Sequence, residues 1–273
     1  MPTIAEKAER FRELHARSGA FIIPNPFDIG SARILQHLGF EALATTSSGF
    51  AFTLGRRDHR VTRDEAIEHS RALVDATDIP ISADLENGFG DDPETVAETV
   101  RLAAGAGLAG CSIEDSTQRP EDPMYGMPLA LDRIRAAVDA ARSVGRPFTL
   151  TARAENYLHG RRDMKETIAR LQAYQDAGAD VLFAPGLTTI DEVRALISAV
   201  DRPVNVLAGI PGLCFTVAEL ASAGTKRISV GGALSRVALA AVVRAGREMS
   251  VHGTFTFVNE PISSREIGGM FGA

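Results

Sequence analysis

Three successive apolar segments of this 273-residue chain end in charged side chains whose types and spacing could support catalysis. The segment ISADLE ends with Asp84 and Glu86, GCSIE ends with Glu114, and FTLTAR ends with Arg153. If these segments are neighbouring strands, side-chain alternation directs Asp84 and Glu86 to the same face. Glu114 and Arg153 can face the same space from the next two strands. Three carboxylates that share a small space repel one another unless a cation lies among them.

Oxygen ligands without histidine or cysteine favour Mg²⁺ or Mn²⁺, so the three acids form a candidate metal site. The guanidinium of Arg153 is a planar fork that binds a carboxylate or a phosphate through two parallel bonds. The sequence therefore predicts metal-assisted chemistry on a small acidic substrate. A single acid at a strand end would more simply cap a helix or pair with a surface arginine, which are the alternatives for Glu155, Asp91 and Asp115.

The elements that must position these residues form a regular alternation of short apolar segments and helix-like segments. The predicted strands are 20–24, 42–46, 81–86, 110–114, 148–153, 181–185, 204–209 and 227–231. The segments between them carry helix-start signals, such as the capping boxes at Thr62–Glu65 and Thr189–Glu192 and the pair Asp92–Pro93. Eight such units in 273 residues predict one α/β domain, a (β/α)8 TIM barrel over 1–273.

The active site of such a barrel lies at the carboxyl ends of its strands, where the charged residues stand. We expect an additional N-terminal helix in 1–18 and a C-terminal tail in 251–273. The apolar residues of the tail suggest self-association, and packing on its own barrel is the simpler alternative. An open doubly wound sheet is the second fold to consider, but no GxGxxG follows the first strand.

The composition disfavours some classes of binding partner and indicates a cellular compartment. The net charge of -6 and the absence of Trp disfavour nucleic acid as a partner. No apolar segment is long enough to span a membrane, and the charged N-terminus does not resemble a signal peptide, so we expect a cytoplasmic protein without membrane contact. The two cysteines, Cys111 and Cys214, lack CxxC spacing and predict neither a zinc site nor a disulfide framework.

Four motifs in order resemble the isocitrate lyase/phosphoenolpyruvate mutase superfamily. They are the segment PNPFDIGSARILQHLGFEALATTSSGFAFTLGRRD, then ADLENGFG, SIEDS and TARAEN, and the resemblance extends from about 20 to 235. It implies a (β/α)8 barrel that is usually a tetramer of dimers with exchanged C-terminal helices, so a homo-oligomer is expected. It also implies Mg²⁺ at Asp84, Glu86 and Glu114, with Asp58 nearby; many members carry Asp where Glu86 stands.

The resemblance further implies how a substrate would be held. Backbone N–H groups and a hydroxyl of Ser48, Gly49 and Phe50 would cradle its carboxylate and oxo oxygens. Arg153 matches the superfamily's arginine for the substrate carboxylate.

The loop at 116–129 departs from the best-known members. Its sequence, STQRPEDPMYGMPL, lacks the Lys-Lys/Arg-Cys-Gly-His motif of the lyases and the Lys and Asn of the phosphonomutases. Cys111 cannot replace the missing cysteine, because alternation along its strand directs it away from the barrel interior. The candidate proton donors are Tyr125, whose alternative role is to pack the loop, and a metal-bound water.

The predicted activity is that of a Mg²⁺-dependent carbon–carbon lyase or decarboxylase. The substrate would be a small 2-oxo or 2-hydroxy (di)carboxylic acid that reacts through a metal-stabilised enolate. A phosphonopyruvate-type carbon–phosphorus enzyme and a non-catalytic barrel that binds a keto acid are the alternatives. A Schiff-base aldolase is disfavoured, because Lys7, Lys165 and Lys226 do not stand at carboxyl ends of strands.

Overall fold

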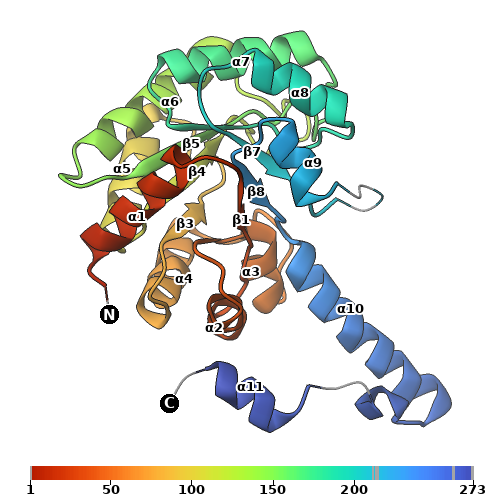
Figure 1. The fold of residues 1–273 in the computed structure, drawn as a ribbon. Helices are drawn as coiled ribbons and strands as arrows, with labels where there is room; N and C mark the ends of the chain where they lie inside the picture. The colour runs from red at the N-terminus through yellow and green to blue at the C-terminus, as the bar shows by residue number, and fades with distance from the viewer. Residues whose placement is uncertain (1, 211, 213–214, 260–261, 272–273) are drawn as a thin grey trace.

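Eight parallel strands form one sheet in the order β1-β8-β7-β6-β5-β4-β3-β2. The computed structural model describes residues 2–210, 212, 215–259 and 262–271 (Figure 1). The strands are β1 (Phe21–Ile23), β2 (Leu43–Ala44), β3 (Ile81–Asp84), β4 (Gly110–Glu114), β5 (Thr149–Arg153), β6 (Val181–Phe183), β7 (Val204–Leu207) and β8 (Arg227–Ser229). Each of the eight predicted strands is confirmed; β4 has the predicted bounds, and the other seven are one to three residues shorter than predicted.

Helices follow the strands in the expected alternation. They are α1 (Ile4–Ala16), α2 (Ile29–His37), α3 (Ser47–Thr53), α4 (Arg63–Ala76), α5 (Pro93–Gly105), α6 (Met127–Arg142), α7 (Met164–Asp176), α8 (Ile190–Ser198), α9 (Val217–Ser222), α10 (Ala233–Arg247) and α11 (Ser264–Met270), with a π-helix η1 (Glu248–His252) and a 3₁₀ helix η2 (Thr256–Asn259). Both capping boxes form, at Thr62 with Glu65 and at Thr189 with Glu192. Asp92 caps α5 and Pro93 is its first residue, so the predicted helix starts are confirmed.

The sheet closes into a (β/α)8 barrel between β1 and β2 without a regular ladder. The Ala44 N–H donates to the Pro24 carbonyl over 3.1 Å, and the Asn25 amide donates to the Thr45 carbonyl over 2.9 Å. Asn25 also accepts bonds from the backbone N–H groups of Val230 and Gly231, both 2.9 Å. One asparagine therefore joins the carboxyl ends of β1, β2 and β8 at the mouth of the barrel.

The main apolar core lies between the sheet and the surrounding helices, and it includes Cys111, which is fully buried. The outward direction predicted for Cys111 is confirmed; Cys214 lies outside the described residues. A second, smaller cluster lies where α1 packs across the amino-terminal end of the barrel. Phe11 and Leu14 of α1 contact the barrel there, beside Phe21 and Ile23 of β1. The N-terminal helix closes the end of the barrel that lies opposite the candidate site.

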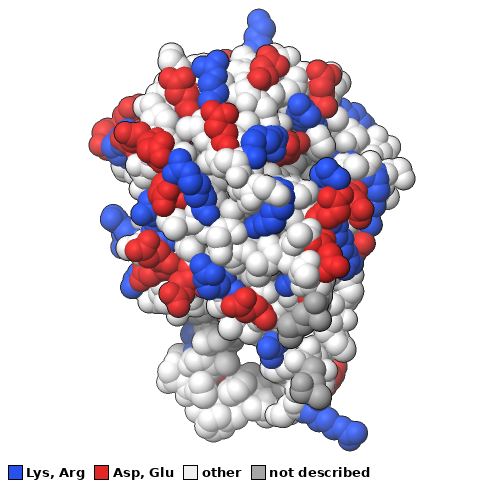
Figure 2. Space-filling model, turned by 90° about the vertical axis from the view of Figure 1, so that its left-hand side faces the viewer, with Lys and Arg blue, Asp and Glu red and all other residues white. Residues whose placement is uncertain are grey.

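The C-terminal segment extends away from the barrel. Helix α10 begins at the barrel mouth and points outward, and α11 returns beside α2 (Figure 1). We call α10, η1, η2 and α11 the C-terminal arm. The lower part of the space-filling view, where the arm lies, shows few charged atoms (Figure 2). Within the described residues, no helix combines the length and the apolar character that a membrane span requires.

Candidate active site

A cavity of about 220 Å³ opens at the carboxyl ends of the strands. Four of the residues predicted for the site line it: Ser48, Asp58, Asp84 and Arg153. Its wall also contains Asn25, Asn205, Leu207, Arg227, Ser229, Gly231 and Gly232. Asn205 and Leu207 both face inward, as alternation along β7 requires. The carboxyl-terminal position of the cavity is the one that the barrel fold predicts.

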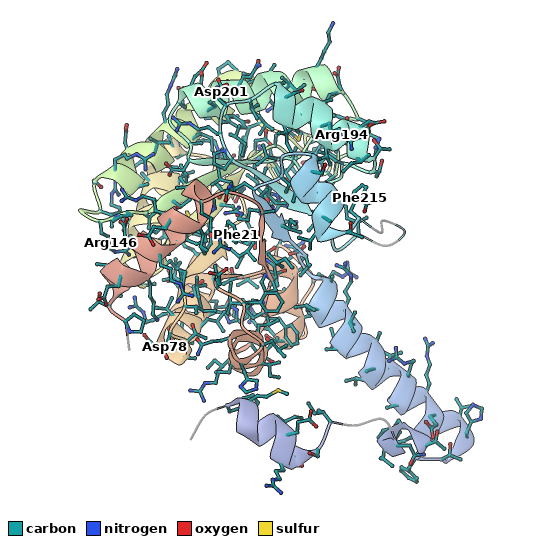
Figure 3. The ribbon with its side chains drawn as sticks, viewed as in Figure 1. Phe21, Asp78, Arg146, Arg194, Asp201 and Phe215 are labelled. Atoms are coloured by element: carbon teal, nitrogen blue, oxygen red, sulfur yellow. The ribbon has the colours of Figure 1, made fainter. Side chains whose placement is uncertain are left out.

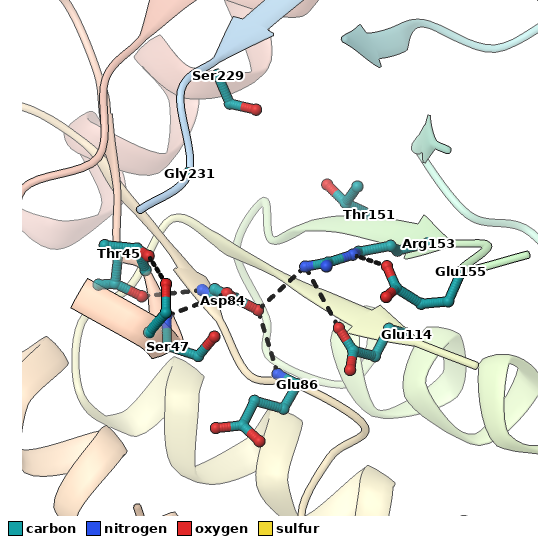
Figure 4. A network of polar contacts seen from close by, with 12 residues as sticks. Thr45, Ser47, Asp84, Glu86, Glu114, Thr151, Arg153, Glu155, Ser229 and Gly231 are labelled. Carbon is teal, nitrogen blue, oxygen red and sulfur yellow. Dashed lines mark hydrogen bonds and ion pairs between the residues drawn. The ribbon is translucent and has the colours of Figure 1, made fainter. Parts of the chain in front are cut away.

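Arg153 lies at the centre of an acidic cluster (Figure 4). Its Nη1 is 3.3 Å from Glu114 Oε2 and 3.7 Å from Asp84 Oδ1, and its Nε pairs with Glu155. Although burial alone would lower it, these carboxylates raise the pKa of Arg153, so the guanidinium stays protonated. The structure therefore brings together Asp84, Glu114 and Arg153, and it adds Glu155, which had a helix-capping alternative.

Glu114 combines burial with an unused oxygen. Its side chain is 3% exposed, and within the described part of the chain Oε1 has no hydrogen-bond partner. Burial raises the pKa of Glu114, and the positive charge of Arg153 opposes that shift. A buried carboxylate oxygen without a partner, close to Asp84, has the donor chemistry that a divalent cation requires. Asp84 and Glu114 thus offer carboxylate oxygens that fit a divalent cation.

Glu86 lies in a separate group. Strand β3 ends at Asp84, and Glu86 adopts φ of +50°, so side-chain alternation no longer applies to it. Its carboxylate accepts bonds from His59 Nδ1 at 2.9 Å and Gln118 Nε2 at 2.6 Å. Asp58, His59 and Glu86 each offer one potential ligand atom, and these three atoms lie within 4.8 Å of one another. Alternation along β3 therefore does not set the direction of Glu86, but Glu86 and Asp84 line a common small pocket beside the cavity.

Three loops meet at Glu86 in a strained arrangement. His59, Glu86 and Gln118 all have positive φ, which is uncommon for residues other than glycine. The hydrogen bond to Glu86, followed by nearby carboxylate charges, raises the pKa of His59 to about 9 against the effect of burial. A protonated His59 and Glu86 then form an ion pair that joins the loops after β2, β3 and β4. No periodic pattern indicates His59 or Gln118, since both lie in loops.

The predicted cradle at 48–50 is the start of α3. Thr46 caps this helix, with its hydroxyl accepting from the Gly49 N–H and its carbonyl from the Phe50 N–H. The Ser47 N–H donates to Asp84 Oδ2 over 3.1 Å, so the helix start also fixes the candidate metal ligand. Because the N–H groups of Gly49 and Phe50 are used within α3, Ser48 is the residue of this cradle that reaches the cavity.

Tyr125 lies outside the cavity wall. Its hydroxyl donates to Asp91 Oδ1 over 2.6 Å and accepts from Asn87, and the guanidinium of Arg133 lies 4.0 Å from its ring centroid. Burial, followed by the bond to Asp91, raises the pKa of Tyr125 to about 12. These contacts correspond to the loop-packing alternative and give Tyr125 no access to a ligand in the cavity.

Asp115 belongs to a buried network behind the site. It accepts bonds from Tyr174 at 2.6 Å, from Arg170 at 3.0 Å and from the backbone N–H of Glu155 at 2.9 Å. The surface arginine suggested for Asp115 is instead Arg170, whose side chain is 6% exposed. This network connects the end of β4 with the end of β5 and with α7, and thereby positions Glu114 and Arg153.

Comparison with known proteins gives consistent matches over most of the chain. The family model described as phosphoenolpyruvate phosphomutase matches residues 11–250. The crystal structure of a provisionally assigned lyase/mutase from Burkholderia cenocepacia superposes with a TM-score of 0.96 and 58% identity, covering 99% of this chain and 97% of that one. The 2-methylisocitrate lyase of Salmonella typhimurium is 31% identical, over 79% of this chain and 75% of that protein. The oxaloacetate decarboxylase of Paraburkholderia xenovorans is also 31% identical, over 89% and 84% of the two chains.

Proposed function

This chain belongs to the isocitrate lyase/phosphoenolpyruvate mutase superfamily, and from that premise we propose that it is a Mg²⁺-dependent carbon–carbon lyase or decarboxylase of a small 2-oxo or 2-hydroxy acid. The relatives named 2-methylisocitrate lyase and oxaloacetate decarboxylase support a carboxylic acid as substrate. The observation that carries the proposal is the buried Glu114, whose Oε1 has no partner among the described residues, next to Arg153, which lines the cavity with Asp84.

Each group at the cavity then has a distinct part in the reaction. Asp84 and Glu114 would hold the ion, and Asp58 and Glu86, whose ligand atoms lie within 4.8 Å of one another, would supply further carboxylate oxygens. The ion would supply electrostatic stabilisation of the negative charge that develops on the oxo oxygen when the neighbouring carbon–carbon bond breaks. Arg153 would bind and orient the carboxylate next to that carbonyl. The Ser48 hydroxyl can donate to a ligand oxygen from the rim of the cavity.

Ligand binding to the wild-type protein tests this proposal directly. We expect Mg²⁺ with one acid among oxaloacetate, pyruvate, 2-oxoglutarate, 2-methylisocitrate and phosphonopyruvate to raise the melting temperature. At a hundredfold excess over Kd the gain is about 2.7 kcal/mol, which corresponds to roughly 5–10 °C for a chain of this size. Differential scanning fluorimetry with and without EDTA measures the shift.

The part of the shift that depends on the acid, measured against Mg²⁺ alone, should disappear in Asp84→Ala and in Arg153→Ala. It should persist in Arg12→Ala, which removes an exposed arginine from α1. A response to phosphonopyruvate alone would favour carbon–phosphorus chemistry. The absence of a shift with all five acids would contradict the small-acid proposal and favour a non-catalytic or larger-ligand role.

We also propose that the C-terminal arm mediates homo-oligomer formation. Val237, Val242 and Val251 are 66%, 67% and 71% exposed, and Phe255 is 62% exposed. Side chains of this kind, grouped on one extended segment, are typical of an interface with a partner. A second copy of the chain is the partner that the superfamily resemblance implies.

Substitution within the arm tests the assembly. Val242→Asp should convert the wild-type dimer or tetramer to a smaller species, because a desolvated carboxylate in an apolar interface is strongly unfavourable. Size-exclusion chromatography with light scattering gives the mass. Val217→Asp, at a 45% exposed valine of α9, is the matched control and should leave the mass unchanged. A wild-type protein that is monomeric at micromolar concentration would refute this assignment.

A further inference from the structure

The interior of the barrel contains a second arginine that no carboxylate neutralises. Arg227 is the first residue of β8, is 5% exposed and lines the same cavity as Arg153. Across the part of the chain that the structure describes, no acid forms an ion pair with it, and its Nη1 has no hydrogen-bond partner. A buried charge without a partner is strongly unfavourable, so such a residue calls for an explanation.

The hydrogen bonds that Arg227 does make go to neutral groups. Nε donates to Asn205 Oδ1 over 2.9 Å, and Nη2 donates to Thr151 Oγ1 over 3.0 Å. Both partners are side chains of the barrel interior, on β7 and β5. Burial lowers the pKa of Arg227 to about 9, so the side chain is still protonated at neutral pH. The positive charge is therefore held in place but not compensated.

The same hydrogen bonds orient the neighbouring hydroxyl groups. Because Asn205 Oδ1 accepts from Arg227, its Nδ2 must donate, and it does so to Ser229 Oγ over 2.9 Å. The hydroxyl hydrogen of Ser229 is then free to donate elsewhere. The Thr151 hydroxyl also accepts from Arg227 and can donate its own hydrogen. Three donors therefore have no acceptor among the described residues: the Nη1 of Arg227 and the hydroxyl groups of Ser229 and Thr151. One cationic donor with two hydroxyl donors is a set that can bind an anion.

The negatively charged side chains and Arg227 lie at different depths of the cavity. The acids Asp84, Glu114 and Glu155 surround Arg153 at the carboxyl end of β5, whereas Thr151, which contacts Arg227, lies two residues deeper on the same strand. Two residues along a strand correspond to about 6.5 Å. Figure 4 shows Thr151 and Ser229 apart from Asp84 and Glu114. The carboxylates of the cavity therefore lie at its mouth, and the guanidinium of Arg227 lies nearer its floor.

We propose that Arg227, with Ser229 and Thr151, binds a second carboxylate of the substrate, so that the enzyme acts on a dicarboxylic acid rather than on a monocarboxylic one. This inference rests on the proposed function for the group at the mouth, where Arg153 binds the first carboxylate. Arg227 acts as a specificity-determining residue. It distinguishes acids with a carboxylate at both ends from acids that end in a methyl group.

A matched pair of stable ligands tests binding of the second carboxylate by Arg227 separately from binding of the first carboxylate by Arg153. L-Malate and L-lactate share the 2-hydroxy acid group, and malate has a carboxylate where lactate has a hydrogen. In isothermal titration with MgCl₂, the wild-type protein should bind malate about tenfold or more tightly than lactate, as expected for a charge-assisted contact. Arg227→Met should bring the two affinities within about twofold by weakening malate alone, and Ser229→Ala should reduce the ratio in part.

Controls separate this role from a structural one. Arg227→Lys keeps the charge and should retain a preference for malate, whereas Arg12→Met removes an exposed arginine and should leave the ratio unchanged. If Arg227→Met does not fold, as judged by circular dichroism, the Lys and Ser229→Ala variants decide the test. Equal weakening of malate and lactate in these variants, or a wild-type ratio near one, would overturn the inference. Failure of the proposed function itself would appear differently, as an absence of Mg²⁺-dependent binding of any acid to the wild-type protein.

Discussion

Arg153→Ala should lower kcat/KM for the acid identified by the binding panel by roughly 10²- to 10⁴-fold. Removal of one partner from a buried charge pair typically costs about 3–5 kcal/mol, and each 1.36 kcal/mol is a factor of ten in rate. Arg153 combines two functions that the substitution would separate. It provides the fork for the substrate carboxylate, and it neutralises Asp84, Glu114 and Glu155 in the absence of a cation.

The second function predicts an opposite effect on the metal. Without the guanidinium, the three carboxylates repel one another more strongly, so Mg²⁺ should bind Arg153→Ala at least as tightly as wild type while the acid no longer binds. Steady-state kinetics together with Mg²⁺ titration calorimetry measure both effects. Arg153→Lys should recover only a small part of the activity, because an ammonium cannot form the bidentate contact. A kcat/KM within threefold of wild type in the alanine variant would rule out Arg153 as the carboxylate-binding residue.

Most of the site prediction came from the residues at the carboxyl ends of the predicted strands. Buried parallel strands give apolar segments that end sharply, and a closed barrel places all their carboxyl ends together. This reasoning correctly placed Asp84 and Arg153 at one cavity and directed Cys111 into the outer core. It does not extend to Glu86, because alternation holds only while the backbone is extended.

The remaining features depend on contacts that no local pattern encodes. The pairing of Glu86 with His59 and Gln118 joins three loops, and loop residues have no periodicity. Arg227 is the first residue of the predicted strand 227–231, but no local pattern indicates its partners, since the register of β8 with β7 places it opposite Asn205. Tyr125 was a reasonable proton donor from its place in the loop, but its hydroxyl is directed to Asp91 by the packing of Arg133 on the ring.

The buried network behind the site provides the largest expected effect on stability. Arg170→Met should lower the free energy of unfolding by about 3–5 kcal/mol, because it leaves Asp115 buried without its cationic partner. That loss corresponds to a fall in melting temperature of roughly 8–15 °C for a chain of this length. Thermal unfolding followed by circular dichroism measures it. The matched control is Arg142→Met, which breaks the exposed pair with Asp180 and should cost no more than about 1 kcal/mol.

A double-mutant cycle shows whether the loss comes from the unpaired acid. Asp115→Asn combined with Arg170→Met removes both charges, so the double variant should be more stable than Arg170→Met alone. Additive losses would instead indicate that each side chain contributes only its own packing. Because Asp115 also accepts the Glu155 N–H and directly follows Glu114, disruption of the pair should displace both ends of the acidic cluster. We therefore expect Arg170→Met to weaken Mg²⁺ binding even below its melting transition, although Arg170 itself does not line the cavity.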